Sequence, residues 1–240
     1  MIRWFKQHVR RKLLSSLGVY EQVTYGKVAF AQEGEDVLLW RIIENHQNGP
    51  GTFVDVGCNH PWSHSNTALF YLKGWSGVAI DPNPDFGDEF AASRPRDVFV
   101  NAGISDERGI LRYHRFDQPL YNTFCEERRM ELESRKISAL RESVDVEVRP
   151  LREVLHTVWG TGKPIDLLSI DAEGFDERIL RSHDFERFPV RFVYVEFQTV
   201  RLDDLMSDPV MELLQLHSFR LVAKLWKSGL FMHCDVLDEL

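Results

Sequence analysis

Polar side chains follow each of five predicted strands, at the point where the strand ends. The carboxyl ends of parallel strands meet at one edge of a sheet, and ligands of open α/β sheets bind at that edge. These residues therefore predict one ligand site built from five segments of the chain. They are Asp55, Gly57, Asn59 and His60 after the first strand, Asp81 and Asn83 after the second, Asn101 and Ser105 after the third, Asp171 and Glu173 after the fourth, and Glu196 and Gln198 after the fifth.

The first two of these segments indicate a nucleoside ligand. Gly57 follows a strand and precedes a helix, where the lack of a side chain lets the backbone approach a ligand closely. Asp81 comes 26 residues after Asp55, in a position where a carboxylate can accept hydrogen bonds from both ribose hydroxyls. Dinucleotide sites share this arrangement but need GxGxxG, and this loop has a single glycine. A nucleoside without phosphates, such as S-adenosylmethionine, fits the loop better than a dinucleotide.

An alternation of strands and helices must position these segments. Strands are predicted at 52–57, 77–80, 97–100, 165–170 and 191–195, and helices at 35–45, 65–72, 151–159, 176–181 and 208–217. This alternation predicts an α/β fold with a mainly parallel sheet and helices on both faces, in one domain over 21–240. Residues 220–225 and 230–236 predict a closing strand pair and thus an antiparallel edge. The segment 105–150 is predicted to be an insertion or cap over the sheet.

The composition is that of an ordinary globular domain. The chain has 240 residues, 43% of them hydrophobic and 28% charged, which is enough apolar material for one core. We expect neither a signal peptide nor a membrane-spanning helix, since no apolar run reaches about 18 residues. The net charge of −8 disfavours nucleic-acid binding, which depends on neutralising phosphates. Three widely spaced cysteines without a CxxC pair argue against a disulfide framework or structural zinc and favour a reducing cytoplasm.

Residues 1–20 form a distinct basic segment. They contain five Lys or Arg residues and no acidic residue, and apolar residues recur among them at three- and four-residue steps. This pattern predicts a basic amphipathic helix. Such a helix either packs on its own domain or a partner, or lies peripherally on the anionic inner face of a membrane. Nothing in the sequence indicates an oligomeric state.

Seven short segments resemble those of one enzyme family. They are AQEGED at 31–36, FVDVGCNHP at 53–61, SNT at 65–67, GWSG at 74–77, DPNP at 81–84, NAGIS at 101–105 and IDLLSIDAEG at 165–174. Together, and in this order, they resemble the FkbM family of S-adenosylmethionine-dependent methyltransferases, a branch of the Rossmann-like enzymes. Two features depart from the common pattern. A third glycine is absent from the first loop, and the acid after the second strand is Asp81, where glutamate is frequent.

The resemblance implies a fold, an activity and a set of cofactor contacts. The fold would be a seven-stranded, mainly parallel Rossmann-like sheet with an antiparallel edge strand. The activity would be O-methylation of a sugar, a glycan, a glycolipid or another small molecule. The expected contacts are Asp55, Gly57 and Asn59 with the methionine part of the cofactor, Asp81 with its ribose, Asn101 and Ser105 on its adenine side, Asp171 beside the reacting sulfonium, and Ser65 as a further contact.

Methyl transfer to a hydroxyl needs a base or a metal, because an alcohol is a weak nucleophile at neutral pH. Histidine titrates near neutrality, so His60 is one candidate base, and Asp171 or Glu173 would serve if an apolar pocket raised the carboxyl pKa. The metal alternative uses Asp171, Glu173 and Glu196 as oxygen ligands of Mg²⁺. Aromatic faces beside hydrogen-bonding groups suit a sugar acceptor. The residues expected to line its pocket are Trp62, His64, Tyr121, Asn122 and Phe124, with Glu196 as a further contact.

Two other functions stay open on the sequence alone. A nicotinamide-dependent oxidoreductase would use a similar sheet, but the missing GxGxxG counts against it. A non-catalytic nucleotide- or sugar-binding module would have no need for Asp55, Asp81, Asp171 and Glu173 together. Binding of S-adenosylmethionine, S-adenosylhomocysteine or NAD would discriminate among the three.

Overall fold

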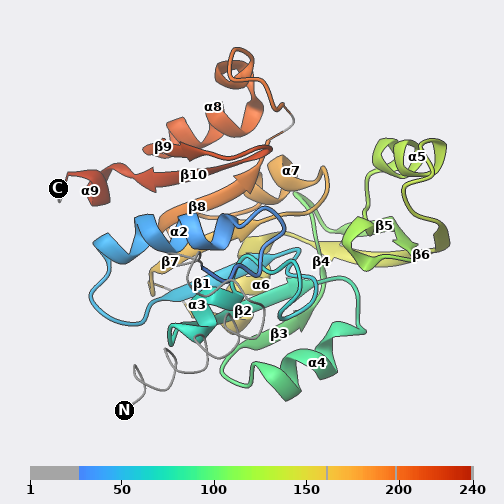
Figure 1. Cartoon of the computed structure of the whole chain (residues 1–240), viewed down its shortest axis with the longest axis horizontal. Coiled ribbons are helices and arrows are strands. Elements are labelled where there is room, and N and C mark those ends of the chain that lie inside the picture. The colour runs from blue at the N-terminus through green and yellow to red at the C-terminus, as the bar shows by residue number, and fades with distance from the viewer. Residues whose placement is uncertain (1–26, 161, 198, 239–240) are drawn as a thin grey trace, which may run out of the picture.

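Seven strands form the central sheet in the order β3-β2-β1-β7-β8-β10-β9 (Figure 1). The structure is a computed structural model that describes residues 27–160, 162–197 and 199–238. The basic helix predicted within residues 1–20 therefore lies outside the described residues. The strands are β1 Thr52–Val56, β2 Ser76–Asp81, β3 Val98–Asn101, β7 Ile165–Ile170, β8 Val190–Glu196, β9 Phe219–Lys224 and β10 Ser228–His233.

The first five strands of that order are parallel, and their registers bring the carboxyl ends to one edge. Val56 of β1 lies beside Ile80 of β2 and beside Ile170 of β7, and Ile170 lies beside Val195 of β8. β10 runs antiparallel to β8 and to β9. The predicted mainly parallel seven-stranded sheet is thus confirmed. The antiparallel strand is the second from the edge, because β9 pairs on its outer side.

Helices cover both faces of the sheet, as the sequence predicts. Alternate residues of a strand point to opposite faces, so Phe53 packs in one apolar core and Val54 in the other. The core that contains Val54 also includes residues of α6, α7 and α8, and the core that contains Phe53 includes residues of α2, α3 and α9. These helices are α2 Glu35–Ile43, α3 Ala68–Leu72, α6 Leu151–Val158, α7 Asp176–Arg181, α8 Pro209–Leu216 and α9 Cys234–Leu237. No described helix is long and apolar enough to cross a bilayer.

A second, three-stranded sheet is built from the segment predicted to be an insertion or cap. β4 (Gly103–Ile104) pairs with β6 (Leu140–Arg149), and β6 pairs antiparallel with β5 (Gly109–Phe116). Helix α5 (Glu126–Ser134) lies in the connection between β5 and β6. Figure 1 shows β5, β6 and α5 together at one end of the molecule, beyond the central sheet. We call residues 109–149 the cap hairpin.

Four elements differ from the sequence prediction. Helix α4 (Phe86–Ser93) and helix α5 were not predicted. Helix α3 begins at Ala68 rather than at Ser65, because the Ser65 hydroxyl accepts a hydrogen bond from the Ala68 amide and so caps the helix from outside. The last predicted strand ends at His233, whose ring accepts from the Asp235 amide and caps α9.

Candidate functional site

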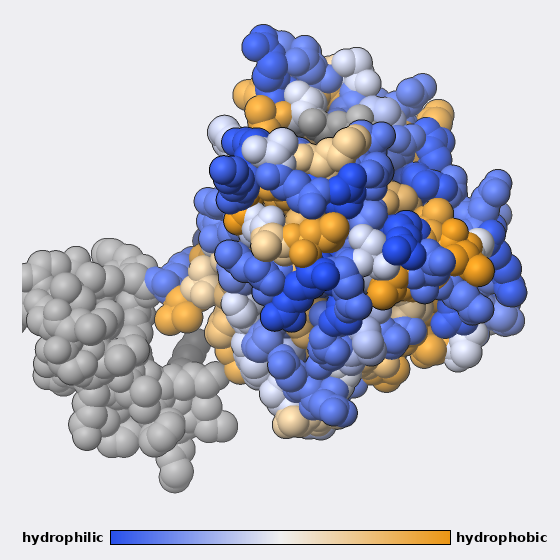
Figure 2. Space-filling view, turned by 90° about the vertical axis from the view of Figure 1, so that its right-hand side faces the viewer, coloured by the Kyte–Doolittle hydropathy of each residue, from blue (hydrophilic) through white to orange (hydrophobic). Residues whose placement is uncertain are grey.

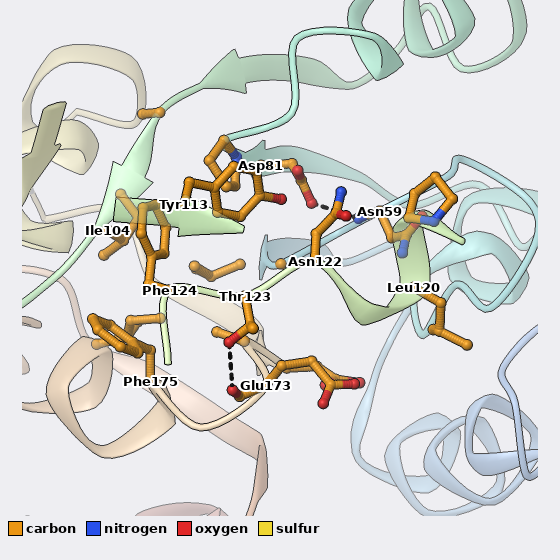
Figure 3. A pocket seen from close by; sticks show the side chains of 18 of the residues that line it. Asn59, Asp81, Ile104, Tyr113, Leu120, Asn122, Thr123, Phe124, Glu173 and Phe175 are labelled. Atoms are coloured by element: carbon orange, nitrogen blue, oxygen red, sulfur yellow. Dashed lines mark hydrogen bonds between the residues drawn. The ribbon is translucent and has the colours of Figure 1, made fainter. Parts of the chain in front are cut away.

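The carboxyl edge of the sheet and the cap hairpin enclose a pocket (Figure 3). The space between its walls, counted together with the solvent at its open mouth, is about 670 Å³. The loops of the central sheet contribute Val56, Gly57, Asn59, His64, Asp81, Pro82, Ala102, Ile104, Asp171, Ala172 and Glu173. The cap hairpin contributes Tyr113, Pro119, Leu120, Asn122, Thr123 and Phe124, and the start of α7 contributes Phe175 and Ile179.

Gly57 is required where β1 and β7 end. Its backbone has φ +78°, a left-handed conformation that favours glycine. A Cβ atom at this position would lie 1.9 Å from the carbonyl oxygen of Asp171. The Gly57 amide donates to the carbonyl of Ile80, and the Asp171 amide donates to the carbonyl of Val56. The single glycine therefore lets three strand ends close on one another beneath the pocket.

Asp81 connects two loops at the pocket wall. Its Oδ2 accepts from the Asn59 amide at 3.0 Å and its Oδ1 accepts from the Asn83 amide at 2.8 Å. Burial raises the pKa of Asp81 to about 6, against the lowering effect of these two amides. Each carboxylate oxygen has a second lone pair. Asp81 can therefore hold the loops and also accept hydrogen bonds from a ligand.

Acidic groups gather at the end of β7. Asp171 and Glu173 both line the pocket, and Asp176 and Glu196 lie close enough to raise the pKa of Asp171. Burial is the larger cause of that rise, and it holds the Asp171 pKa well above the usual range. Burial and then Glu196 raise the pKa of Asp176 to about 8, although the amides of Ala172 and Gly174 donate to its carboxylate. A cation in the pocket would relieve this repulsion.

Glu173 joins this acidic cluster to the cap hairpin. Its carbonyl accepts from the Thr123 hydroxyl at 3.0 Å (Figure 3), and its Oε2 lies 3.0 Å from Nε of Arg128 on α5. The Glu173 side chain is 19% exposed and the Arg128 side chain 21%, so the pair is largely shielded from solvent. Burial raises the pKa of Glu173, with a further rise from Glu196, and Arg128 lowers it. Arg128 therefore favours the ionised form of a carboxylate in the pocket wall.

Replacing Arg128 by glutamine is expected to move the acid limb of the pH–activity profile to higher pH. The reason is that Glu173 loses the cation that lowers its pKa. Arg128→Lys should restore part of the shift, since a lysine keeps the charge without the planar fork. Arg112→Gln is the matched control, because Arg112 pairs with Asp145 on the exposed part of the same cap hairpin. A profile that Arg128→Gln leaves unchanged would show that Glu173 is not titrating in the reaction.

The other half of the pocket is apolar and aromatic. The rings of Tyr113 and Phe124 lie 4.7 Å apart between centroids, and those of Phe124 and Phe175 lie 5.6 Å apart. Figure 3 shows these rings with Ile104 on one side of the pocket, and Asn59 and Leu120 on the other. Burial and then Asp81 raise the pKa of Tyr113, whose side chain hydrogen-bonds that of Asn122. A ligand therefore meets flat apolar surfaces at one end of the pocket, with the carboxylate of Asp81 beside them (Figure 3).

Asp55 and Ser65 lie beneath the pocket rather than in its lining. The Thr67 hydroxyl donates to Oδ2 of Asp55 at 2.6 Å, and Arg94 donates to Thr67 Oγ1, to Ser65 Oγ and to the carbonyl of Pro61. The Arg94 side chain is fully buried and pairs with Asp97. This network fixes the loop between β1 and α3 from below. The two predicted cofactor residues thus support the loop that forms the pocket wall.

His60 also lies outside the pocket lining, and both of its ring nitrogens have partners. Nδ1 accepts from the amides of Trp62 and Ser63, each at 3.0 Å, and Nε2 lies 3.0 Å from a carboxylate oxygen of Glu89. Because Nδ1 accepts two hydrogen bonds, the ring proton of the neutral form belongs on Nε2. The contacts of His60 therefore order the loop after β1.

The remaining predicted residues are divided between the pocket and its surroundings. Gly57, Asn59, His64, Asp81, Asn122, Phe124, Asp171 and Glu173 line the pocket. Trp62 packs against Phe30 and Tyr71, and the Asn101 amide group donates to the carbonyl of Asp81. Ser105 donates to Asp106, and the Tyr121 amide donates to the carbonyl of Gln118. Trp62, Asn101, Ser105, Tyr121 and Glu196 are therefore neighbours of the pocket and not part of its wall.

The residues expected to bind Mg²⁺ do not fit that ion. In the described parts of the chain, no group of three or more His, Cys, Asp or Glu side chains lies close enough to hold a metal. Glu173 is paired with Arg128, and Oε1 of Glu196 lies 3.1 Å from Nζ of Lys227. A metal would have to compete with two cations for these carboxylates. We therefore derive no step through a metal.

Sequence reasoning did not identify Tyr113, Arg94 or Arg128 as site residues. Tyr113 stands in a short alternating stretch that predicts a strand but no function, and neither arginine belongs to a motif. Thr123 stands between Asn122 and Phe124, which the sequence does single out, and Phe175 directly follows the segment IDLLSIDAEG at 165–174. Including the polar residue between two predicted ones, and extending that segment by one aromatic residue, would have found both.

The comparison with known families agrees with this geometry. The model of the methyltransferase FkbM domain matches residues 55–221, which include every residue that lines the pocket. No curated protein and no solved structure matches the chain significantly.

Proposed function

Because the chain belongs to the FkbM methyltransferase family, we propose that it transfers a methyl group from S-adenosylmethionine to a hydroxyl of a sugar, glycan or glycolipid. The observation that carries the proposal is one pocket at the carboxyl edge of the sheet that is lined both by aromatic rings and by the carboxylates of Asp81, Asp171 and Glu173. S-adenosylmethionine has the matching halves, a flat adenine and a tail that carries a sulfonium and an ammonium group.

The cofactor would lie across the ends of β1, β2 and β7. Its adenine would pack against Pro82, Ala102 and the aromatic rings, and its ribose hydroxyls would donate to Asp81. Its methionine tail would follow the backbone at Gly57 and Asn59, and the sulfonium would face Asp171. Four contacts differ from those that the family resemblance implies. Asp55 and Ser65 would act through the loop that they support, and Asn101 and Ser105 lie outside the pocket wall.

The transfer would be an in-line displacement. The acceptor oxygen forms a bond with the methyl carbon as the carbon–sulfur bond breaks, and the electron pair of that bond stays on the sulfur of S-adenosylhomocysteine. The hydroxyl proton must leave at the same time, and Asp171 or Glu173 lies in the pocket wall to accept it. Much of the acceleration would come from holding the oxygen and the methyl group in line.

The acceptor would enter beside the cap hairpin. Asn122 and His64 place an amide and an imidazole in the pocket wall near the apolar side chains of Pro119 and Leu120. A sugar ring offers hydroxyls that would hydrogen-bond to Asn122 and His64, and C–H faces that would pack against Pro119 and Leu120. Among the residues expected to bind an acceptor, these are the two polar ones that line the pocket. Trp62, Tyr121 and Glu196 would act from outside it.

Calorimetry with S-adenosylmethionine, S-adenosylhomocysteine and NAD tests the cofactor assignment. We expect binding of the first two and no binding of NAD, because the loop with one glycine offers no pyrophosphate cradle. Binding of NAD alone would favour the oxidoreductase. Transfer of a labelled methyl group to a panel of glycans and glycolipids then tests the acceptor class, and labelling of other acceptors only would refute that part of the proposal.

Replacing Asp81 by asparagine is expected to weaken S-adenosylhomocysteine binding by about 1–3 kcal/mol, roughly a 5- to 150-fold higher Kd. The asparagine side chain has one acceptor oxygen, so it can accept from the backbone amide of Asn59 or of Asn83 but not from both. Its NH₂ group would face the other amide, and one loop would lose its hydrogen bond. The wild-type affinity should also fall as the pH drops through about 6, since ribose needs the ionised carboxylate. Asp88→Asn, on the exposed surface of α4, is the control. An unchanged Kd for Asp81→Asn would remove Asp81 from the ribose role.

A further inference from the structure

A groove on the outside of the sheet is rich in arginine. It lies along α6 and is lined by Arg108, Arg149, Arg152, His156 and Arg187, with the acidic residues Glu153 and Asp184. A second hollow shares Arg108 and Arg149 with it and reaches Ala102, which also lines the methyl-transfer pocket. The groove therefore starts beside the pocket but has a separate lining.

Three of the four arginines of this groove lack the carboxylate partner that most described arginines have. In the described chain, five arginines have no carboxylate within ion-pair distance, namely Arg96, Arg149, Arg152, Arg187 and Arg220. Three of the five lie together here. Arg152 donates to the carbonyl of Ser182, whereas the guanidinium of Arg149 makes no hydrogen bond or ion pair with a described residue. Acidic residues outnumber basic ones in this chain, whose net charge is −8. Three neighbouring arginines without a carboxylate partner therefore indicate an external anion.

The charges within the groove do not cancel. Arg108 is neutralised by Glu153, whose Oε2 lies 2.8 Å from its Nε. Asp184 accepts from the backbone amide of Arg187, not from its guanidinium. Nδ1 of His156 lies 2.9 Å from Nη2 of Arg187, so the histidine accepts a hydrogen bond there and orients the arginine. Four arginines face two carboxylates, and the groove keeps a positive charge on an acidic protein.

We propose that this groove binds the phosphoryl groups of a ligand at a site distinct from the methyl-transfer pocket. The planar forks of guanidinium groups match the oxygens of phosphate and bind them in a bidentate manner. Arg149 leaves the end of β6, Arg152 the first turn of α6 and Arg187 the loop before β8, so they reach the groove from three segments. Three guanidinium groups from separate segments suit a ligand with more than one anionic group. The site does not depend on which cofactor the pocket takes.

Titration calorimetry of the full chain with inorganic pyrophosphate at fixed ionic strength tests the proposal. We expect saturable binding of one pyrophosphate per chain, with a Kd of about 1 mM or lower. The double variant Arg149→Gln, Arg152→Gln should raise the Kd at least about tenfold, since it loses two charge-assisted contacts. The control is Arg112→Gln, Arg141→Gln, which removes the same charge from the cap hairpin, where both arginines have carboxylate partners. Its Kd should stay near the wild-type value.

The following outcomes decide whether the groove is a phosphoryl site. Binding that does not saturate, or an equal loss in both double variants, would overturn the proposal, because general electrostatic attraction would then explain the result. Unchanged S-adenosylhomocysteine affinity in both variants shows that they are folded. Vesicles of phosphatidylcholine and phosphatidic acid that compete with pyrophosphate on the wild type, but not on the groove variant, would identify a lipid head group as the source of the phosphate. Vesicles that fail to compete would assign the site to a soluble phosphorylated ligand.

Discussion

Replacing Asp171 by asparagine is expected to lower methyl transfer by about 10²–10⁴-fold and, at the same time, to raise the thermal unfolding midpoint at pH 8. Turnover falls because the change removes the negative charge and the basicity of a carboxylate that faces the proposed sulfonium. Stability rises because the change also removes a charge that burial, Glu196 and Glu173 all disfavour. A residue kept only for folding would not combine these two effects.

The stability effect has a defined sign with pH. The pKa of Asp171 is raised in the folded protein above the unfolded value of 3.8, so the folded state binds more protons in the interval between the two values. The wild type therefore loses stability as the pH rises through that interval, and the asparagine variant does not share this loss. The difference in unfolding midpoint between them should be small at pH 4 and larger at pH 8.

Three measurements test the Asp171 prediction. They are turnover with an acceptor that the wild type methylates, S-adenosylhomocysteine affinity, and thermal melts across this pH range. The affinity should change little, because that product has no sulfonium charge. Asp145→Asn on the exposed β6 is the control for a lost surface charge. Near-normal turnover would move the catalytic centre elsewhere, and a lower midpoint at pH 8 would give Asp171 a structural role.

Replacing Gly57 by alanine is expected to destabilise the fold by about 2–5 kcal/mol and to abolish measurable cofactor binding in the protein that still folds. The left-handed backbone costs about 1–2 kcal/mol for a residue with a side chain, and overpacking adds about 1–3 kcal/mol. The new methyl group would meet the Asp171 carbonyl, so the ends of β1 and β7 would have to separate. Asp171 and the cofactor loop would move with them.

Two other glycines separate the causes of this effect. Gly49 has φ +103°, but a methyl group added there would meet only open space, so Gly49→Ala should cost only the backbone strain. Gly77, at the opposite edge of the sheet, would place a Cβ atom 2.0 Å from the carbonyl of Phe53. Gly77→Ala should therefore destabilise the fold while its folded fraction still binds S-adenosylhomocysteine. Denaturant unfolding and calorimetry on all three variants test this, and a Gly57→Ala protein with wild-type affinity would contradict it.

The central sheet was predictable because its local patterns are unambiguous. The apolar runs at 52–56 and 165–170 are each bounded by turn residues or acids, and both form buried parallel strands. The alternation of strands with helices then restricts the topology. Helix α5 was not predictable in this way, since Glu126–Ser134 has few apolar residues and buries only Leu132. Its arginines and glutamates form ion pairs that depend on the finished helix.

The site was predictable mainly where its residues follow a strand. Asp81, Asp171 and Glu173 stand at strand ends, and the parallel topology brings them to the pocket. Arg94 and Arg128 could not be found, because each reaches its partner across 27 to 45 residues of sequence through tertiary packing. His60 shows the opposite problem. Its residue type suits catalysis, but the two amides that donate to Nδ1 decide its contacts, and no sequence pattern specifies them.

The surface of the cap end bears on the choice of acceptor. Figure 2 views this end of the molecule and shows hydrophobic residues in separate patches within a mostly hydrophilic surface. The exposed large apolar side chains of the cap hairpin include Ile110 of β5 and Met130 of α5. Single exposed apolar residues are ordinary on a protein surface. This end of the molecule is therefore compatible with a hydrated acceptor such as a glycan.

The link between α5 and Glu173 has a consequence for protein engineering. Thr123 and Arg128 hold the loop after β7, so the stretch from 123 to 128 is coupled to the proposed reaction centre. Pro119 and Leu120 line the same pocket, and their apolar side chains cannot form a hydrogen bond or an ion pair with that loop. Libraries intended to change the accepted substrate should therefore vary 117–121 and keep 123–128 fixed. A cap hairpin taken from another enzyme would need an arginine at the position of Arg128, where it can pair with Glu173 and hold the loop after β7 in place.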